Sequence, residues 1–145
     1  MTSAVLAQGT LMKIGDGAGN YTTIAEVKNL AGPALSQAAV DVTNHDSANQ
    51  FREYIAGLRD GGKVTFDVNW IPSNATQGFT TGLLKAGFGG AKGASAQQFR
   101  IVFPDAATTT WTFTGIVTKL APSSGVDKEL VASIEIQVSG QPTLA

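Results

Sequence analysis

Apolar and polar residues alternate along four stretches of the chain. In residues 63–71, polar side chains separate the apolar Val64, Phe66, Val68 and Trp70. Successive side chains of a β-strand point to opposite faces, so this alternation predicts a strand with one buried face. The same pattern recurs in residues 98–103, 109–118 and 129–139. The sequence therefore predicts a mainly β protein whose strands share one apolar core.

Weaker strand signals lie in the first third of the chain. Residues 10–14 and 21–30 are expected to pair as a hairpin, because the Gly and Asn residues of segment 15–20 tolerate the positive φ of a tight turn. Residues 38–43 are expected to form another short strand. Turn residues mark strand ends at residues 32–33, 60–62, 104–107 and 122–125.

One helix is expected, at residues 74–86. Phe79 and Leu83 share one face with two alanines at helical spacing, which is typical of a helix packed on a sheet. Two glycines inside this segment each cost about 1 kcal/mol relative to alanine, so only packing can hold the helix. The glycine-rich residues 87–96 that follow are expected to form a loop.

The segment 40–60 leaves two interpretations open. It is too long for a tight hairpin connection, and its second part, residues 51–58, is either a short helix or irregular. Its apolar side chains either complete the core of the subunit or bind a neighbouring copy, since apolar anchors are typical of interface centres. These side chains are Phe51, Tyr54, Ile55 and Leu58.

The composition narrows the function classes. The chain has 145 residues, enough for one domain. It contains no cysteine, which excludes disulfides, thiolate zinc sites and cysteine nucleophiles. The formal net charge is −1, and only 14% of residues are charged, against roughly 25% in typical domains. This balance argues against a dedicated nucleic-acid binder and lets copies of the chain approach one another with little repulsion.

Catalytic motifs are weak. Asp41, His45, Asp46 and Ser47 supply the residue types of a hydrolase triad, but polar turns have the same composition. The glycine-rich residues 15–19 continue neither as a P-loop nor as a dinucleotide-binding motif. We therefore expect a protein that is not an enzyme, with no catalytic, cofactor or metal site.

No segment approaches the roughly 20 apolar residues of a membrane span. The N-terminus also lacks the basic residues that begin a secretory signal. We expect no membrane contact and no export through the secretory pathway.

Four segments occur along the chain in an order that, taken together, is typical of one protein family. They are residues 41–43 (Asp-Val-Thr) with 46–47 (Asp-Ser), 56–62 (Ala-Gly-Leu-Arg-Asp-Gly-Gly), 100–105 (Arg-Ile-Val-Phe-Pro-Asp) and 134–142 (Ile-Glu-Ile-Gln-Val-Ser-Gly-Gln-Pro). Together, from about residue 27 to residue 142, they resemble the major tail tube proteins of long-tailed, non-contractile bacteriophages (siphophages).

The resemblance implies a fold and an assembly. The fold is a β-sandwich or small barrel with one flanking helix, shared with the type VI secretion tube. The chain would be a single tail tube domain, residues 1–145, without the immunoglobulin-like C-terminal domain of some members. Copies would close into rings, usually hexamers, whose inner strands join into one barrel around a channel. Rings would stack into the tail tube of the virion after assembly in the host cytoplasm.

The resemblance also implies partners and candidate site residues. The partners are further copies of the chain, the tape-measure, tail-tip and tail-terminator proteins, and DNA in transit. Channel-facing residues are expected on the polar strand faces, where carboxylates repel phosphates; they are Asp67, Asn69, Glu135 and Gln137. Contacts between copies are expected at Asp41, Asp46, Phe51, Tyr54, Ile55, Leu58 and Arg59.

Two alternatives remain open from the sequence. One is a type VI secretion tube subunit, which would share the architecture and move effectors instead of DNA. The other is a monomeric β-sandwich that binds a carbohydrate or decorates a surface. Regular tubes or rings of purified protein in negative-stain microscopy would exclude a monomeric binder.

Overall fold

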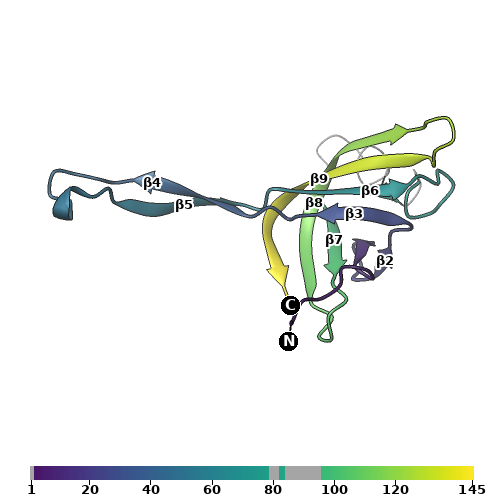
Figure 1. The fold of residues 1–145 in the computed structure, drawn as a ribbon, viewed down its shortest axis with the longest axis horizontal. Helices are drawn as coiled ribbons and strands as arrows, with labels where there is room; N and C mark the ends of the chain where they lie inside the picture. Colours follow the sequence, from purple (N-terminus) through teal and green to yellow (C-terminus); the bar gives the residue numbers. More distant parts are fainter. Residues whose placement is uncertain (1, 79–81, 84–95) are drawn as a thin grey trace.

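The fold consists almost entirely of antiparallel strands (Figure 1). The computed structural model describes residues 2–78, 82–83 and 96–145. The strands are β1 (Leu11–Gly15), β2 (Tyr21–Thr23), β3 (Val27–Ala31), β4 (Ser36–Asp41), β5 (Tyr54–Asp60), β6 (Lys63–Asn69), β7 (Gln97–Val102), β8 (Thr110–Ser123) and β9 (Val131–Leu144). A single 3₁₀ turn, η1 (Ala48–Gln50), lies between β4 and β5. The expectation of a mainly β protein is confirmed.

Seven strands form one bent sheet in the order β2-β1-β7-β8-β9-β6-β3. The two longest strands, β8 and β9, pair with each other over most of their length. However, only residues 110–115 of β8 are paired with β7, and only residues 131–137 of β9 are paired with β6. The sheet therefore has two halves that share β8 and β9. We call them the β1–β7 half, which includes β2, and the β3–β6 half.

The core lies on the inner faces of both halves. The alternating apolar side chains in stretches 63–71, 98–103 and 129–139 supply most of this core, as the alternation of apolar and polar residues predicts. Phe99 and Phe113 stack with ring centroids 5.7 Å apart. Each fully buried side chain of this kind contributes about 1.5–3 kcal/mol. The buried apolar residues are Met12, Ile14, Ile24, Val64, Phe66, Val68, Leu83, Phe99, Ile101, Phe113, Val117, Ala132, Ile134, Ile136 and Val138.

Two strand predictions need correction. The predicted hairpin of β1 and β2 is present, but the single strand expected over residues 21–30 is two strands. A turn at Ala25 and Glu26 separates them, and Glu26 has a φ of 53°. The strand expected to end near Thr118 runs on to Ser123, so Pro122 lies in β8 and not in the following turn.

The helix expected from residue 74 does not begin there. Residues 74–78 form turns and bends, held by the fully buried amide of Gln77. Its Nε2 donates to the carbonyl oxygens of Ala25 (2.8 Å) and Asn69 (3.1 Å), and its Oε1 accepts from the Ile71 N–H (2.8 Å). The rest of the predicted helix, apart from residues 82–83, and nearly all of the predicted loop 87–96 lie outside the described residues.

Strands β4 and β5 form a separate two-stranded sheet that projects far from the main sheet (Figure 1). Residues 51–58, expected to be helical or irregular, mostly belong to β5. We call residues 36–60 the hairpin. It prolongs β3 and β6 in nearly the same direction (Figure 1). No helix among the described residues is long and apolar enough to span a membrane.

Two glycines shape the neck where the hairpin leaves the main sheet. Gly32 and Gly62 both have positive φ, 104° and 67°. A Cβ on Gly32 would come within 2.5 Å of the carbonyl oxygen of Lys63, and one on Gly62 would overlap the carbonyl oxygen of Ala34. The segment that enters the hairpin and the segment that leaves it therefore pack backbone against backbone at the neck, which only glycine permits.

Candidate functional site

The hairpin exposes large apolar side chains to solvent. The exposed fractions are 74% for Phe51, 53% for Tyr54, 55% for Ile55 and 90% for Leu58. The interpretation that these residues complete the subunit's own core is therefore wrong. A two-stranded hairpin alone is at best marginally stable in water, so this element needs a surface that covers it.

Hydrogen bonds order the tip of the hairpin. Asp41 accepts from the Thr43 N–H at 2.9 Å, and its hydrogen bonds to Thr43 lower the pKa of its carboxyl group. The Glu53 N–H donates to the Thr43 hydroxyl at 2.9 Å, which ties the two sides of the tip together. Asp46, at the outer end, donates its N–H to Asn44 Oδ1 at 2.8 Å.

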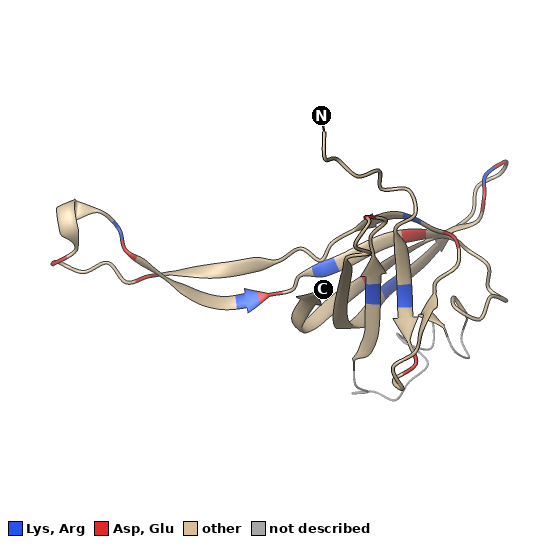
Figure 2. Cartoon of the chain, turned by 90° about the horizontal axis from the view of Figure 1, so that it is seen from below, with Lys and Arg blue, Asp and Glu red and all other residues tan. Residues whose placement is uncertain are grey.

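The tip does not form a catalytic triad. The Ser47 hydroxyl donates to the Glu53 carboxylate at 3.0 Å, whereas a nucleophile would donate to His45. Acidic and basic residues are interspersed along the hairpin and over the sheet (Figure 2). Among the described residues, no group of three or more His, Cys, Asp or Glu could hold a metal ion.

A groove of about 730 Å³ opens at the base of the hairpin. Arg59, predicted to contact a neighbouring copy, lines it together with Asp60. Trp111 and Leu144, from the start of β8 and the end of β9, supply apolar surface on the opposite side. The groove thus joins the hairpin to the free end of the long strands.

The four predicted channel residues lie together on the outer face of the β3–β6 half. In the ladder of β6 and β9, Asp67 stands opposite Ser133 and Thr65 stands opposite Glu135. The alternate residues Phe66 and Ile134 are buried in the core. Asn69 and Gln137 lie on the same outer face, so the strand alternation places all four side chains on one face of the sheet.

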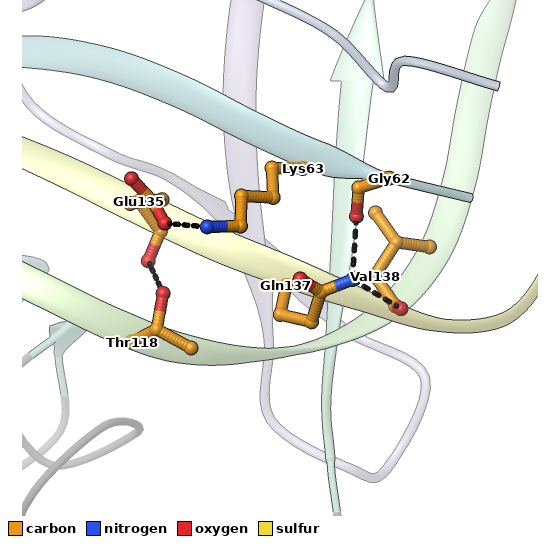
Figure 3. Close-up of polar contacts among 6 residues, drawn as sticks. All are labelled: Gly62, Lys63, Thr118, Glu135, Gln137 and Val138. Atoms are coloured by element: carbon orange, nitrogen blue, oxygen red, sulfur yellow. Dashed lines mark hydrogen bonds and ion pairs between the residues drawn. The ribbon is translucent and has the colours of Figure 1, made fainter. Parts of the chain in front are cut away.

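Two of these residues are held by cross-strand contacts (Figure 3). Lys63 donates to the Glu135 carboxylate at 2.6 Å, and this hydrogen bond lowers the pKa of Glu135. Gln137 donates from Nε2 to the carbonyl oxygen of Gly62 at 2.9 Å. Thr118, from β8, donates its hydroxyl to the backbone oxygen of Glu135 at 3.2 Å. Sequence reasoning missed Lys63, although its place at the start of the alternating segment puts it on the same face.

The other acidic groups of this face are also partnered. Ser133 donates its hydroxyl to Asp67 at 2.9 Å, and Asn69 donates its amide to Glu26 at 2.7 Å. Beside them, Lys28 forms an ion pair with Glu129 at 2.8 Å, and this contact lowers the pKa of Glu129. The face is therefore a mixture of paired charges and amides, together with the exposed Lys119 of β8, which has no ion pair among the described residues.

The family of the chain follows from its sequence match. Residues 8–145 match the family model of the lambda phage tail tube protein, TTP. The chain belongs to the lambda phage tail tube protein family. This tail tube protein is therefore a structural protein of the virion tail and not an enzyme. The resemblance to phage tail tube proteins is confirmed.

Solved structures share the tail tube fold. The chain matches a protein from the tail of an empty gene transfer agent particle, refined with C6 symmetry, with TM-score 0.76 and 19% identity, over 98% of this chain and 99% of that chain. A subunit of the SPP1 tail tube matches with TM-score 0.67 and 14% identity, over 97% and 78% of the chains. A sheath/tube terminator structure of an extracellular contractile injection system matches with TM-score 0.72 and 12% identity, over 99% and 98%.

No curated protein sequence matches this tail tube protein. The family, the fold and the virion setting therefore come from the family model and the solved structures.

Proposed function

We propose that six copies of this tail tube protein close into a ring, that the rings stack into a tube, and that DNA leaves the particle through its channel. The observation that carries the proposal is the projecting hairpin, whose large apolar side chains are exposed to solvent in the subunit. The C6 symmetry of the similar gene transfer agent tail supports a ring of six. The tape-measure, tail-tip and tail-terminator proteins are the further partners of the assembly in this proposal.

The hairpin is the contact between copies in this proposal. Covering Phe51, Tyr54, Ile55 and Leu58 would remove apolar surface from water at roughly 25 cal/mol per Å². Asp41 and Asp46 flank these apolar residues at the tip, and Arg59 lies near the base. An apolar centre with a polar rim is the usual anatomy of a protein interface.

The channel wall is the outer face of the β3–β6 half, with Asp67, Asn69, Glu135 and Gln137 toward the DNA. The ion pairs of Lys28 and Lys63 support the assignment, because lysines that already contact carboxylates offer phosphates little to bind, which leaves Lys119 as the one lysine of the described face without an ion pair. A duplex binds nonspecifically mainly where free basic groups release its counterions. A wall of paired charges and amides lets DNA slide.

Replacing two hairpin side chains tests the contact. Phe51→Ser with Leu58→Ser should leave the subunit folded, since both side chains are exposed, but should abolish tubes in negative-stain microscopy. Circular dichroism and thermal unfolding of the monomer check the fold. Val126→Ser is the matched control, because Val126 is 92% exposed in the turn between β8 and β9.

Three outcomes are decisive. Tubes in the control and none in the double variant support the hairpin as a contact between copies. Normal tubes in the double variant contradict it. An insoluble double variant would show that these side chains stabilise the subunit itself, which also contradicts the proposal.

A further inference from the structure

A row of polar side chains crosses the outer face of the β1–β7 half. Thr23 stands opposite Lys13, Lys13 stands opposite Arg100, and Arg100 stands opposite Thr112. Residues directly opposite each other in antiparallel strands share a face, and the two neighbours of Arg100 along β7 are buried in the core. We call these four residues the basic row.

Neither cation of the basic row has an acidic partner. Lys13 and Arg100 form no ion pair among the described residues, and the rest of the chain contains no Asp or Glu. Like charges directly opposite each other on neighbouring strands are destabilising. The two cations therefore oppose folding where they stand, and an anion bound between them would relieve this repulsion.

Packing holds the guanidinium of Arg100 in place. Its Cζ lies 3.9 Å from the ring centroid of Tyr21, and the Tyr21 hydroxyl donates to Gln98 Oε1 at 3.1 Å. The Arg100 Nε is buried and has no hydrogen-bond partner among the described residues. A buried donor without an acceptor is uncommon in folded proteins. This one points to an acceptor that the described residues do not supply.

We propose that the basic row is a phosphate-binding site on the outer surface of the tube, and that its ligand is a flexible polymer with repeating phosphate groups. Lys13 supplies a point charge and Arg100 a planar fork of donors, and proteins use both to bind phosphate. The hydroxyls of Thr23 and Thr112 flank the cations and donate to further phosphate oxygens.

The outward direction of the basic row rests on the channel wall proposed above. The two halves of the main sheet pack their inner faces on one core, so their outer faces point away from each other. If the β3–β6 half lines the channel, the basic row lies on the outside of the tube. DNA in transit then does not meet these two cations, which would otherwise hold its phosphates.

Repetition of the basic row along the tube favours a polymer as the ligand. Each copy carries one row, so the rows recur around every ring and from ring to ring. A ligand that engages many weak sites at once binds far more tightly than its single groups do. A flexible chain follows the curved outer surface, whereas duplex DNA is stiff over roughly 150 base pairs.

Co-sedimentation of assembled tubes with long-chain inorganic polyphosphate tests the site. Lys13→Gln should weaken binding by roughly tenfold or more, because it removes a charged donor from every copy. Lys128→Gln is the matched control. Lys128 is exposed in the turn between β8 and β9 and has no ion pair among the described residues, so its loss changes the net charge equally, away from the basic row.

A variant that keeps the net charge gives a second readout. Tyr21→Leu removes the ring beneath the Arg100 guanidinium, so it should also weaken the binding of polyphosphate, with the charge of the subunit unchanged. Circular dichroism and thermal unfolding check that this variant folds. Full binding by a folded Tyr21→Leu variant would contradict the part given to Arg100.

The monomer tests the site without assembly. During titration with inorganic phosphate, the NMR signals of the Lys13, Arg100 and Thr112 amides should shift, and those of β6 should not. Shifts spread evenly over all the lysines would contradict a defined site.

The remaining outcomes separate the site from its ligand. Equal weakening by Lys13→Gln and Lys128→Gln would show a general effect of charge and overturn the inference. Tubes that bind short duplex DNA more tightly than polyphosphate, or inorganic phosphate as tightly as polyphosphate, would overturn a flexible polymer as the ligand.

Failure of the site and failure of the tube are distinguishable. Tubes that bind no polyphosphate contradict the site and leave the proposed function intact. Protein that forms no tubes contradicts the proposed function, and the titration of the monomer still decides whether the basic row binds phosphate.

Discussion

Single residues on the outer face of the β3–β6 half determine its electrostatics. Lys63 and Glu135 stand diagonally across the ladder of β6 and β9, at 2.6 Å between Nζ and Oε1. Exposed ion pairs of this kind contribute little to folding. Their main effect is on the electrostatic potential at the outer face, because a carboxylate in contact partly cancels the charge of each paired lysine.

The pH dependence of stability should reveal this pair. The hydrogen bond from Lys63 lowers the pKa of Glu135 in the folded state. A lowered folded pKa stabilises the protein above the ordinary glutamate pKa, and this contribution is lost as pH falls through the folded pKa. Glu135→Gln should therefore lower the melting temperature slightly at neutral pH and have no such effect in strong acid.

A double-mutant cycle isolates the effect from the other carboxylates. Lys63→Met and Glu135→Gln should be non-additive at neutral pH and additive once Glu135 is protonated. Additive melting temperatures at every pH would show that the contact has no energetic effect.

At the scale of elements, the neck fixes the direction of the hairpin. Gly32 and Gly62 each pack against the backbone of the other segment of the neck, where a Cβ has no room. Gly61 adds a further close approach next to the neck, because a Cβ there would overlap the side chain of Val138. The orientation of the whole element therefore depends on these close backbone contacts.

Substitution at the neck should disturb assembly as well as stability. Gly62→Ala adds a Cβ at positive φ against the Ala34 carbonyl, and we expect a loss of about 1–3 kcal/mol in the free energy of unfolding. It should also reduce tube formation, because the hairpin must turn to relieve the overlap. Denaturant unfolding and electron microscopy measure the two effects.

Gly17→Ala is the matched control for Gly62→Ala. Gly17 has a φ of 82°, but nothing lies within 4 Å of the added Cβ. The control therefore carries the backbone strain without the overlap. Equal losses in the two variants would mean that the close approach at the neck has no part in the effect.

The elements with one buried face could be predicted from the sequence. Strands β6, β7 and β9 alternate clearly because one side of each faces the core. The hairpin gave only a weak signal, because both of its faces are exposed in the subunit and its apolar residues occur on both. Alternation within the chain therefore carries no information about the side of the hairpin that another copy covers in the proposed ring.

Two other features had no readable signal. The turns at residues 74–78 depend on Gln77, whose buried amide bonds backbone groups far apart in the sequence. The candidate channel residues could be predicted from strand alternation, but Lys63 as the partner of Glu135 could not. That contact depends on the register between β6 and β9, which alternation within one strand does not determine.

At the scale of the whole molecule, the two halves present different surfaces. On the β1–β7 half, Lys13 and Arg100 stand opposite each other, and the Arg100 guanidinium lies 3.9 Å from the ring centroid of Tyr21. On the β3–β6 half, the lysines Lys28 and Lys63 are paired with carboxylates. The second surface therefore has two of its lysines neutralised by carboxylates, and Lys119 of β8 is exposed there without an ion pair among the described residues.

Charge reversal on the β3–β6 half should slow DNA ejection. Asp67→Lys with Glu135→Lys replaces two negative charges with two positive ones and leaves Lys63 without its partner, so phosphates should bind the wall. Tubes should still form, and high salt should restore the rate by screening. Ejection kinetics of phage carrying the variant, at several salt concentrations, measure the effect.

The neutral variant Asp67→Asn with Glu135→Gln is the control for size and hydrogen bonding. It should slow ejection less than the charge reversal does. Unchanged kinetics in both variants would place the channel wall elsewhere on the molecule.

The length of β8 and β9 has a mechanical consequence. Each runs for 14 residues through both halves of the sheet, and their shared ladder shifts register at residues 112–114 and 117–119 of β8. A force directed along these strands acts on all the hydrogen bonds between β8 and β9 at the same time. Many of these bonds must therefore break together instead of one after another. A subunit built in this way resists stretching far more than bending, which suits a filament that must flex in solution and still transmit a tug from one end to the other.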